Sequence, residues 1–162
     1  MINKKFLSTL APAALGVLAI ILAMFLRGAT YSEEGASIYV KMFGVIFGGG
    51  KAYTEAFGYE AAVGFSGGMS YFGMVAFLAV VAGVALLVFA YLKENDLFIL
   101  VGNGLLVIGG LAMLLLLSAG TEIEGLPFKD FYGELNLGLG AYVWAILCSL
   151  GGAFGIYNHK FR

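Results

Sequence analysis

The residues in this sequence best suited to chemistry are carboxylates that lie between its apolar stretches. They are Glu33, Glu34, Glu55, Glu60, Glu122, Glu124, Asp130 and Glu134. Carboxylate oxygens are the ligands that Ca²⁺ and Mg²⁺ prefer. The spacing matches no EF-hand or other ligand motif, so we expect a solvated acidic surface with no metal site and no bound cofactor.

The other reactive side chains are isolated. The only histidine, His159, stands beside Lys160 near the end of the chain, where we expect a solvated residue. The only cysteine, Cys148, lies in an apolar stretch and is typical of a small packing residue. The glycine runs carry no phosphate-binding GxxxxGK[ST] motif. Because no catalytic constellation is present, the sequence predicts that this protein is not an enzyme.

Four apolar stretches must position all other residues. The chain has 162 residues, 61% of them hydrophobic and 12% charged, whereas soluble domains carry about 25% charged residues. A helix of about 20 apolar residues crosses a bilayer. The sequence therefore predicts an all-α membrane protein, a four-transmembrane-helix bundle in a single domain over residues 1–162. The expected helices are Phe6–Leu26, Tyr71–Leu92, Leu97–Ser118 and Leu135–Tyr157.

The orientation of these helices follows from the charges between them. The first stretch could be a secretory signal peptide, but its apolar run exceeds the about 7–15 residues of such a signal, so we expect a retained helix. An even number of spans places both termini on one side. Positive charge is densest there, around Lys4–Lys5, Lys93 and Lys160–Arg162. The positive-inside rule therefore predicts both termini in the cytoplasm and the protein in the cell membrane.

The first outer segment, residues 28–70, is predicted to form a small antiparallel sheet. Val, Ile, Tyr and Phe favour a strand over Ser37–Phe47, and the alternative is a membrane-dipping helix over Ile38–Phe47. Gly48–Gly50 has the backbone freedom that a hairpin turn needs. A second strand is then expected over Lys51–Glu60.

One face of that second strand is expected to carry Lys51, Tyr53, Glu55, Phe57 and Tyr59. Residues Ala61–Phe65 favour a third short strand. The second outer segment, residues 119–134, is predicted to be a compact acidic loop.

Aromatic side chains are unusually frequent in the first outer segment. The candidates for an interface are Tyr39, Phe43, Phe47, Tyr53, Phe57, Tyr59 and Phe65. Aromatic residues are enriched in protein–protein contacts, and unpaired strand edges recruit partners. The alternative is that these side chains pack between the sheet and the helix ends.

Small and polar residues within the helices are candidates for helix packing. Ala79 and Gly83 are four residues apart, as are Gly151 and Gly155, a spacing that lets helix backbones approach closely in lipid. This packing could lie within one bundle or between subunits. Asn103 is expected to hydrogen-bond a neighbouring helix, with substrate contact as the alternative.

The order of predicted elements resembles the claudin-like four-span architecture: helix, long strand-forming outer loop, helix, tight inner turn, helix, shorter outer loop, helix. The resemblance covers the whole chain in topology, but the Trp and two-Cys signature of the claudin first loop is absent between Gly28 and Ser70. The chain also resembles small four-span proteins of bacteria. No functional residue can be transferred from either likeness.

These observations favour a membrane protein that acts by association, as a homo-oligomer or as an accessory subunit of a membrane complex. The formal net charge of −1 argues against a nucleic-acid partner, because phosphate binding needs a concentrated basic surface. No charged residue lies in the middle of a predicted span, which disfavours ion-coupled transport. A pore or small-solute transporter and, more remotely, a lipid-acting enzyme are the alternatives.

Overall fold

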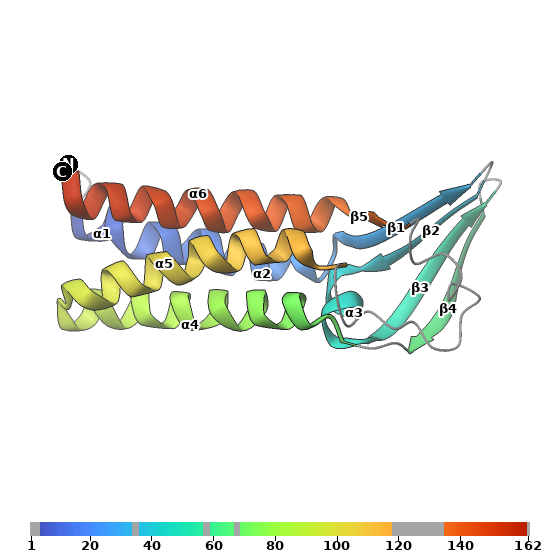
Figure 1. Cartoon of the computed structure of the whole chain (residues 1–162), viewed down its shortest axis with the longest axis horizontal. Helices are drawn as coiled ribbons and strands as arrows, with labels where there is room; N and C mark the ends of the chain where they lie inside the picture. The colour runs from blue at the N-terminus through green and yellow to red at the C-terminus, as the bar shows by residue number, and fades with distance from the viewer. Residues whose placement is uncertain (1–3, 34–35, 57–58, 67–68, 118–134, 162) are drawn as a thin grey trace.

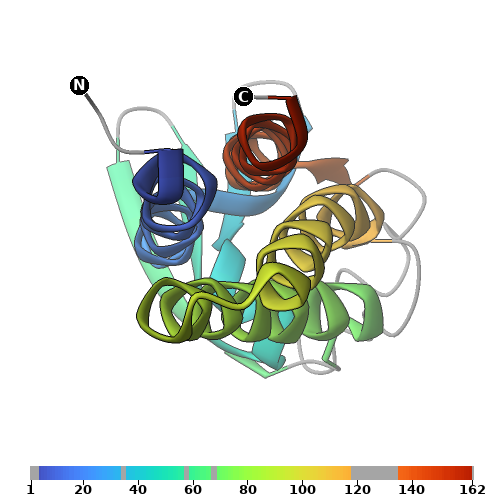
Figure 2. The ribbon, with the colours of Figure 1, turned by 90° about the vertical axis from the view of Figure 1, so that its left-hand side faces the viewer.

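The computed structural model describes residues 4–33, 36–56, 59–66, 69–117 and 135–161. Long helices run side by side, and a β-sheet extends beyond one end of them, the sheet end (Figure 1). Lys4 in the first helix and Phe161 in the last lie at the opposite end, the terminal end. Seen along the bundle, four helices follow one another around its axis: α2 (Leu10–Ala23), α4 (Tyr71–Lys93), α5 (Asp96–Ala112) and α6 (Leu139–Phe161) (Figure 2).

Four helical segments are long and apolar enough to cross a membrane. They are Lys4–Ala23, Tyr71–Lys93, Asp96–Leu115 and Leu139–Phe161. The predicted pattern of four candidate spans is therefore confirmed. Large apolar side chains on the outer surface of the helices remain exposed, for example Leu78, Ile108 and Leu150.

The first span is made of two helices, α1 (Lys4–Ser8) and α2 (Leu10–Ala23). They are separated at Thr9, whose backbone leaves helical geometry (φ −126°, ψ −72°) and whose hydroxyl donates to the Lys5 carbonyl at 2.5 Å. Pro12 is the third residue of α2, where its missing N–H breaks no helical hydrogen bond. The span predicted over Phe6–Leu26 ends earlier, because the chain leaves the helix for the sheet.

The next two spans form an antiparallel pair with a tight turn, as predicted. Ser70 caps α4 (Tyr71–Lys93) by accepting the Gly73 N–H at 3.1 Å. Glu94 ends this helix in the left-handed region (φ 54°), and Asn95 caps α5 (Asp96–Ala112). A short 3₁₀ helix, η1 (Met113–Leu115), continues α5. Ser118, the predicted end of this span, lies outside the described residues.

The sheet has five antiparallel strands in the order β4-β3-β2-β1-β5. The strands are β1 (Arg27–Glu33), β2 (Ala36–Lys41), β3 (Gly49–Ala56), β4 (Tyr59–Ser66) and β5 (Asn136–Leu137). A small sheet was predicted, but β1 and β5 were not. Few residues of β1 favour a strand by themselves, and β1 is held by pairing with β2 and β5 on its two sides.

The strand predicted over Ser37–Phe47 is wrong in its second half. Strand β2 ends at Lys41, and Met42–Phe47 forms the short helix α3. The alternative of a helix over this region is correct only for those six residues. Met42, Val45 and Ile46 are almost fully buried. A strand turns alternate side chains to opposite faces, whereas a helix can bury these three together against the end of the bundle.

Gly48–Gly50 does not form the predicted hairpin turn. Gly48 caps the C-terminus of α3 in the left-handed region (φ 73°), and β3 begins at Gly49. The strand predicted over Lys51–Glu60 is also divided, since Ala56 pairs with Tyr59 and the chain reverses between them. Phe57 lies outside the described residues, and Tyr59 belongs to β4 rather than to the face of Tyr53 on β3. The third strand predicted over Ala61–Phe65 is confirmed within β4.

The last span begins later than predicted. Helix α6 covers Leu139–Phe161, whereas residues 136–137 form β5 and pair with Ala29 and Thr30 of β1. Gly138 links β5 to α6, and its N–H donates to the Gly28 carbonyl at 2.9 Å. The apolar sequence alone gives no sign of this pairing, because the partners are more than a hundred positions apart.

The bundle interior is filled with apolar side chains. Leu87 of α4, Leu106 of α5, and Trp144 and Cys148 of α6 are all at most 1% exposed. The Trp144 indole donates to the Gly109 carbonyl at 3.2 Å, which satisfies its buried N–H.

Candidate functional site

Two tyrosines and two cations meet on one face of the sheet, next to the bundle, which we call the polar face. Tyr39 of β2 pairs in register with Tyr53 of β3, and their rings stack with centroids 5.1 Å apart. The Arg27 guanidinium lies 4.0 Å from the Tyr39 ring, and the Lys41 ammonium lies 5.2 Å from the Tyr53 ring. Both distances fit cation–π contacts, so this face is positively charged and aromatic.

A carboxylate partly neutralises the positive charge of this face. Glu55 Oε2 lies 3.6 Å from Arg27 Nη2, and both side chains are about half exposed (54% and 46%). Such an exposed pair contributes about 0–1 kcal/mol. Its effect is therefore to direct the guanidinium toward β3 rather than to stabilise the fold.

The aromatic residues of α3 contact the bundle. Phe43 and Phe47 pack edge-to-face against each other and against Phe77 of α4, with centroids 5.3–5.7 Å apart. Phe77 in turn stacks on Trp144 at 6.3 Å. These two candidates for the interface thus lie where the sheet meets the helix ends, as the alternative interpretation expected, although Phe47 keeps 42% of its surface exposed.

The other candidate aromatics lie on the sheet. Tyr39 and Tyr53 are half-buried in their stack. Tyr59 and Phe65 belong to β4, in register with Ala56 and Gly50. The structure therefore distributes the predicted interface residues over α3, the polar face and the edge strand.

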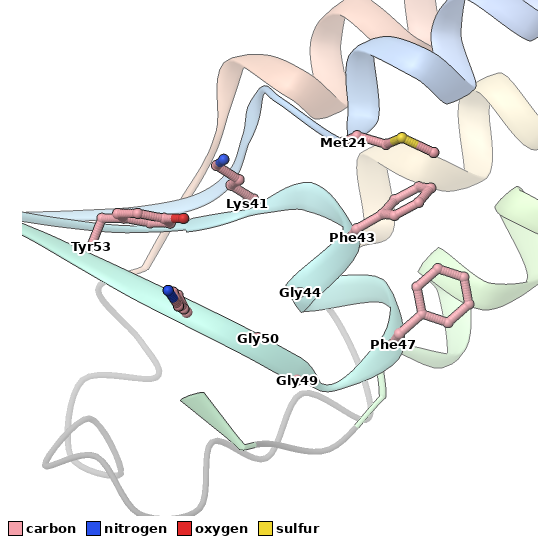
Figure 3. Close-up of a pocket in the computed structure, with 9 residues that line it drawn as sticks. Met24, Lys41, Phe43, Gly44, Phe47, Gly49, Gly50 and Tyr53 are labelled. Carbon is pink, nitrogen blue, oxygen red and sulfur yellow. The ribbon is translucent and has the colours of Figure 1, made fainter. Parts of the chain in front are cut away.

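A cavity of about 330 Å³ opens between α3, the polar face and the end of α2 (Figure 3). Met24, Phe43 and Phe47 line its helix side, and Lys41 and Tyr53 line its strand side (Figure 3). The remaining lining residues are Gly44, Gly49, Gly50 and Lys51. A volume of this size is at the lower end of the range for small-molecule sites.

The predicted packing glycines lie at close helix contacts within the chain. A Cβ at Gly83 of α4 would lie 2.8 Å from the Gly102 carbonyl of α5, and one at Gly151 of α6 would lie 3.1 Å from Leu15 of α2. Ala79 of α4 is half-buried. These contacts join α4 to α5 and α6 to α2.

Asn103 lies at the centre of a four-residue contact between helices. It is fully buried, and its Nδ2 donates to the Ser8 carbonyl at 2.9 Å and to the Ile99 carbonyl at 2.8 Å. Its Oδ1 lies against Gly155 of α6 and has no hydrogen-bond partner among the described residues. The side chain thus joins α1, α5 and α6.

The terminal end carries a cluster of polar side chains that was not predicted from the sequence. Lys5 Nζ lies 2.7 Å from Glu94 Oε1, and His159 Nε2 lies 3.9 Å from Asp96 Oδ1. The Lys5 ammonium donates to the Glu94 carboxylate and so lowers the pKa of Glu94 below its ordinary value. These residues border an open cavity of about 620 Å³. The sequence did contain a signal for this cluster. The predicted placement of both termini on one side brings His159 beside the polar turn.

Within the described ranges, no three His, Cys, Asp or Glu side chains gather as metal ligands would. The acidic loop predicted over residues 119–134 lies outside those ranges. No protein-family model matches this chain, and no curated protein sequence does either.

Proposed function

We propose that this chain is a non-enzymatic integral membrane protein that associates laterally through its outer sheet. The partner we infer is a second copy of the same chain, paired at the edge of β4. An accessory role beside a different membrane protein would use the same edge. In this arrangement the four helices anchor the sheet, and the sheet makes the contact.

Membrane placement is supported by the outer surfaces of the helices. Leu78, Val101, Ile146 and Leu150 are each between 42% and 65% exposed, a pattern that lipid satisfies and water does not. The proposed orientation keeps both termini in the cytoplasm, where Lys4, Lys5, Lys93 and Lys160 would follow the positive-inside rule. The sheet then lies outside the cell.

The free edge of β4 carries the proposal. Among the described residues, β4 pairs only with β3, so one side of an eight-residue strand offers its N–H and C=O groups to a partner. Proteins that avoid such pairing place lysines or prolines on the edge. Here Glu60 is the only charge in the strand, and Ala61 and Ala62 are exposed and small. This composition does not protect the edge against pairing with a second β4 strand.

The pore alternative has less support. The bundle interior is occupied by Leu87, Leu106, Trp144 and Cys148. The polar residues Ser8, Thr9 and Asn103 gather near the terminal end instead of forming a path along the axis.

The test is the oligomeric state of the full chain in lipid nanodiscs. It is measured by cross-linking with a reagent that does not react with cysteine, and by mass photometry. Wild type should dimerise, and Ala62→Lys should weaken dimerisation at least tenfold by placing a charge on the free edge. Ser37→Lys, on the central strand β2, adds the same charge away from the edge and should leave the dimer intact. A monomeric wild type that recovers no cross-linked partner from membranes, or equal loss in both variants, would refute the proposal.

A further inference from the structure

The cavity at the junction of bundle and sheet, the junction cavity, is positively charged. Of its nine lining residues, Lys41 and Lys51 are basic and none is acidic. The nearest carboxylate on the same strand, Glu55, lies beside Arg27 instead. Lys51 is exposed and makes no ion pair among the described residues. The cavity therefore offers two cationic groups to an anion.

The opposite wall of the junction cavity is apolar and continues onto the surface of the bundle. Met24 follows the last turn of α2 and is 45% exposed, and Phe47 of α3 is 42% exposed. Figure 3 shows Met24, Phe43 and Phe47 along one side and Lys41 with Tyr53 along the other. A ligand that fills this space must be anionic at one end and apolar at the other.

The position of the cavity indicates where such a ligand would come from. Met24 directly follows a candidate span. Lys41 is the last residue of β2 and directly precedes α3. If the helices span a bilayer, this level is the boundary between hydrocarbon and headgroups. Between Lys51 and α3 the cavity is bordered by Gly49 and Gly50, and a Cβ at Gly50 would meet nothing within 4 Å, so a headgroup has open access.

We infer that the junction cavity binds an anionic phospholipid of the surrounding bilayer. Its phosphate lies between the Lys41 and Lys51 ammonium groups, and an acyl chain follows Met24 and Phe47 toward the membrane. Lysines that only snorkel to the membrane surface would attract anionic lipid without a cavity. Here, by contrast, the basic residues and the apolar residues line the same cavity. The inference needs the membrane placement but not the pairing at β4.

The experiment measures lipid binding to the full chain in detergent by native mass spectrometry. The probes are phosphatidylglycerol and phosphatidylcholine with identical acyl chains. Each lysine near an anionic headgroup contributes about fivefold in affinity, so we expect a preference of about 25-fold for phosphatidylglycerol. Lys41→Gln with Lys51→Gln should reduce that preference to about twofold or less.

The matched control is Lys93→Gln with Lys160→Gln, which removes the same charge from exposed lysines at the terminal end and should leave the preference unchanged. Equal loss in both double variants, or no preference in wild type, would overturn the inference. Should the cavity variant fail to fold, Lys51→Gln alone should lower the preference about fivefold. An unchanged preference in that variant would overturn the inference equally.

Two further measurements separate a lipid from a soluble phosphate ester. Met24→Gln should weaken phosphatidylglycerol binding several-fold while leaving the preference over phosphatidylcholine intact. Glycerol 1-phosphate should not displace the lipid at equal concentration. Displacement at equal concentration, or unchanged affinity in Met24→Gln, would assign the cavity to a soluble ligand and refute the lipid. Either result leaves the dimer measurement untouched, so the two proposals fail separately.

Discussion

Gly155 of α6 leaves the space that Asn103 of α5 occupies. A Cβ at Gly155 would lie 2.5 Å from Asn103 Cγ and 2.7 Å from Nδ2. Real Cβ atoms do not approach other atoms so closely, so Gly155→Ala must move the amide. The amide then loses its hydrogen bonds to the carbonyls of Ser8 and Ile99. We therefore expect Gly155→Ala to destabilise the bundle.

The size of the effect follows from three contributions. An interhelical hydrogen bond in a membrane contributes about 0.6 kcal/mol on average and at most about 1.7 kcal/mol. Overpacking of a close contact costs about 1–3 kcal/mol, and replacing a helical glycine by alanine returns about 0.5–1 kcal/mol. The net loss in the free energy of unfolding should be about 1–3 kcal/mol.

The assay is unfolding in mixed micelles titrated with sodium dodecyl sulfate and followed by circular dichroism. Gly104→Ala is the matched control, because it lies in the same helix as Asn103 and its Cβ would meet nothing within 4 Å. This control should be neutral or more stable by up to about 1 kcal/mol.

A double variant tests the cause. Asn103→Ala alone should cost about 1–2 kcal/mol through lost hydrogen bonds. Combined with Gly155→Ala, it removes the clash, so the double variant should cost at least about 1 kcal/mol less than the sum of the single costs. If Gly155→Ala were as stable as Gly104→Ala, or if the two single costs simply added, the reasoning would be refuted.

Three more predictions concern the ends of the bundle. Ser70→Ala removes the cap of α4 and a buried hydrogen bond to the carbonyl of Leu116, which follows η1, and should lower the free energy of unfolding by about 1–2 kcal/mol in the same titration. Because Lys5 lowers the pKa of Glu94, the stability from this pair is present above the ordinary pKa of 4.5 and is lost as pH falls through the lowered value. Glu94→Gln should thus reduce the acid dependence of the melting temperature between about pH 5 and pH 3, and an unchanged profile would contradict the pairing. Gly28→Ala would place a Cβ 2.5 Å from the Met42 backbone and should cost about 3 kcal/mol by the same titration, with Gly104→Ala again as control.

The elements with local signals in the sequence were predicted correctly. The candidate spans were evident from hydropathy, since lipid-exposed helices must be apolar along their length. The polar turn between α4 and α5 and the third strand were recognised from short runs of residues. The misassigned elements were those that depend on distant partners. Strand β1, for example, is held by pairing with β2 and β5. Asn103 was expected to hydrogen-bond a neighbouring helix, but the sequence could not identify its partner, the Ser8 carbonyl 95 positions away.

Helix α3 illustrates the difference. Its aromatic and β-branched residues favour a strand, and propensity alone spans only about 1 kcal/mol between residue types. Burial of Met42, Val45 and Ile46 against the bundle outweighs that preference. The junction cavity exists because the chain turns from strand to helix at Lys41. A continuous strand would have left Lys41, Phe43 and Phe47 on one flat face.

Hydropathy along the sequence was sufficient to identify four segments that are apolar enough to cross a membrane, because each residue adds to hydropathy independently of its neighbours. Tertiary structure decided which small residues touch, where the sheet ends, and that Lys41, Lys51 and Met24 border one space. Those outcomes depend on contacts between distant residues, and their energies are fixed only when the helices have packed.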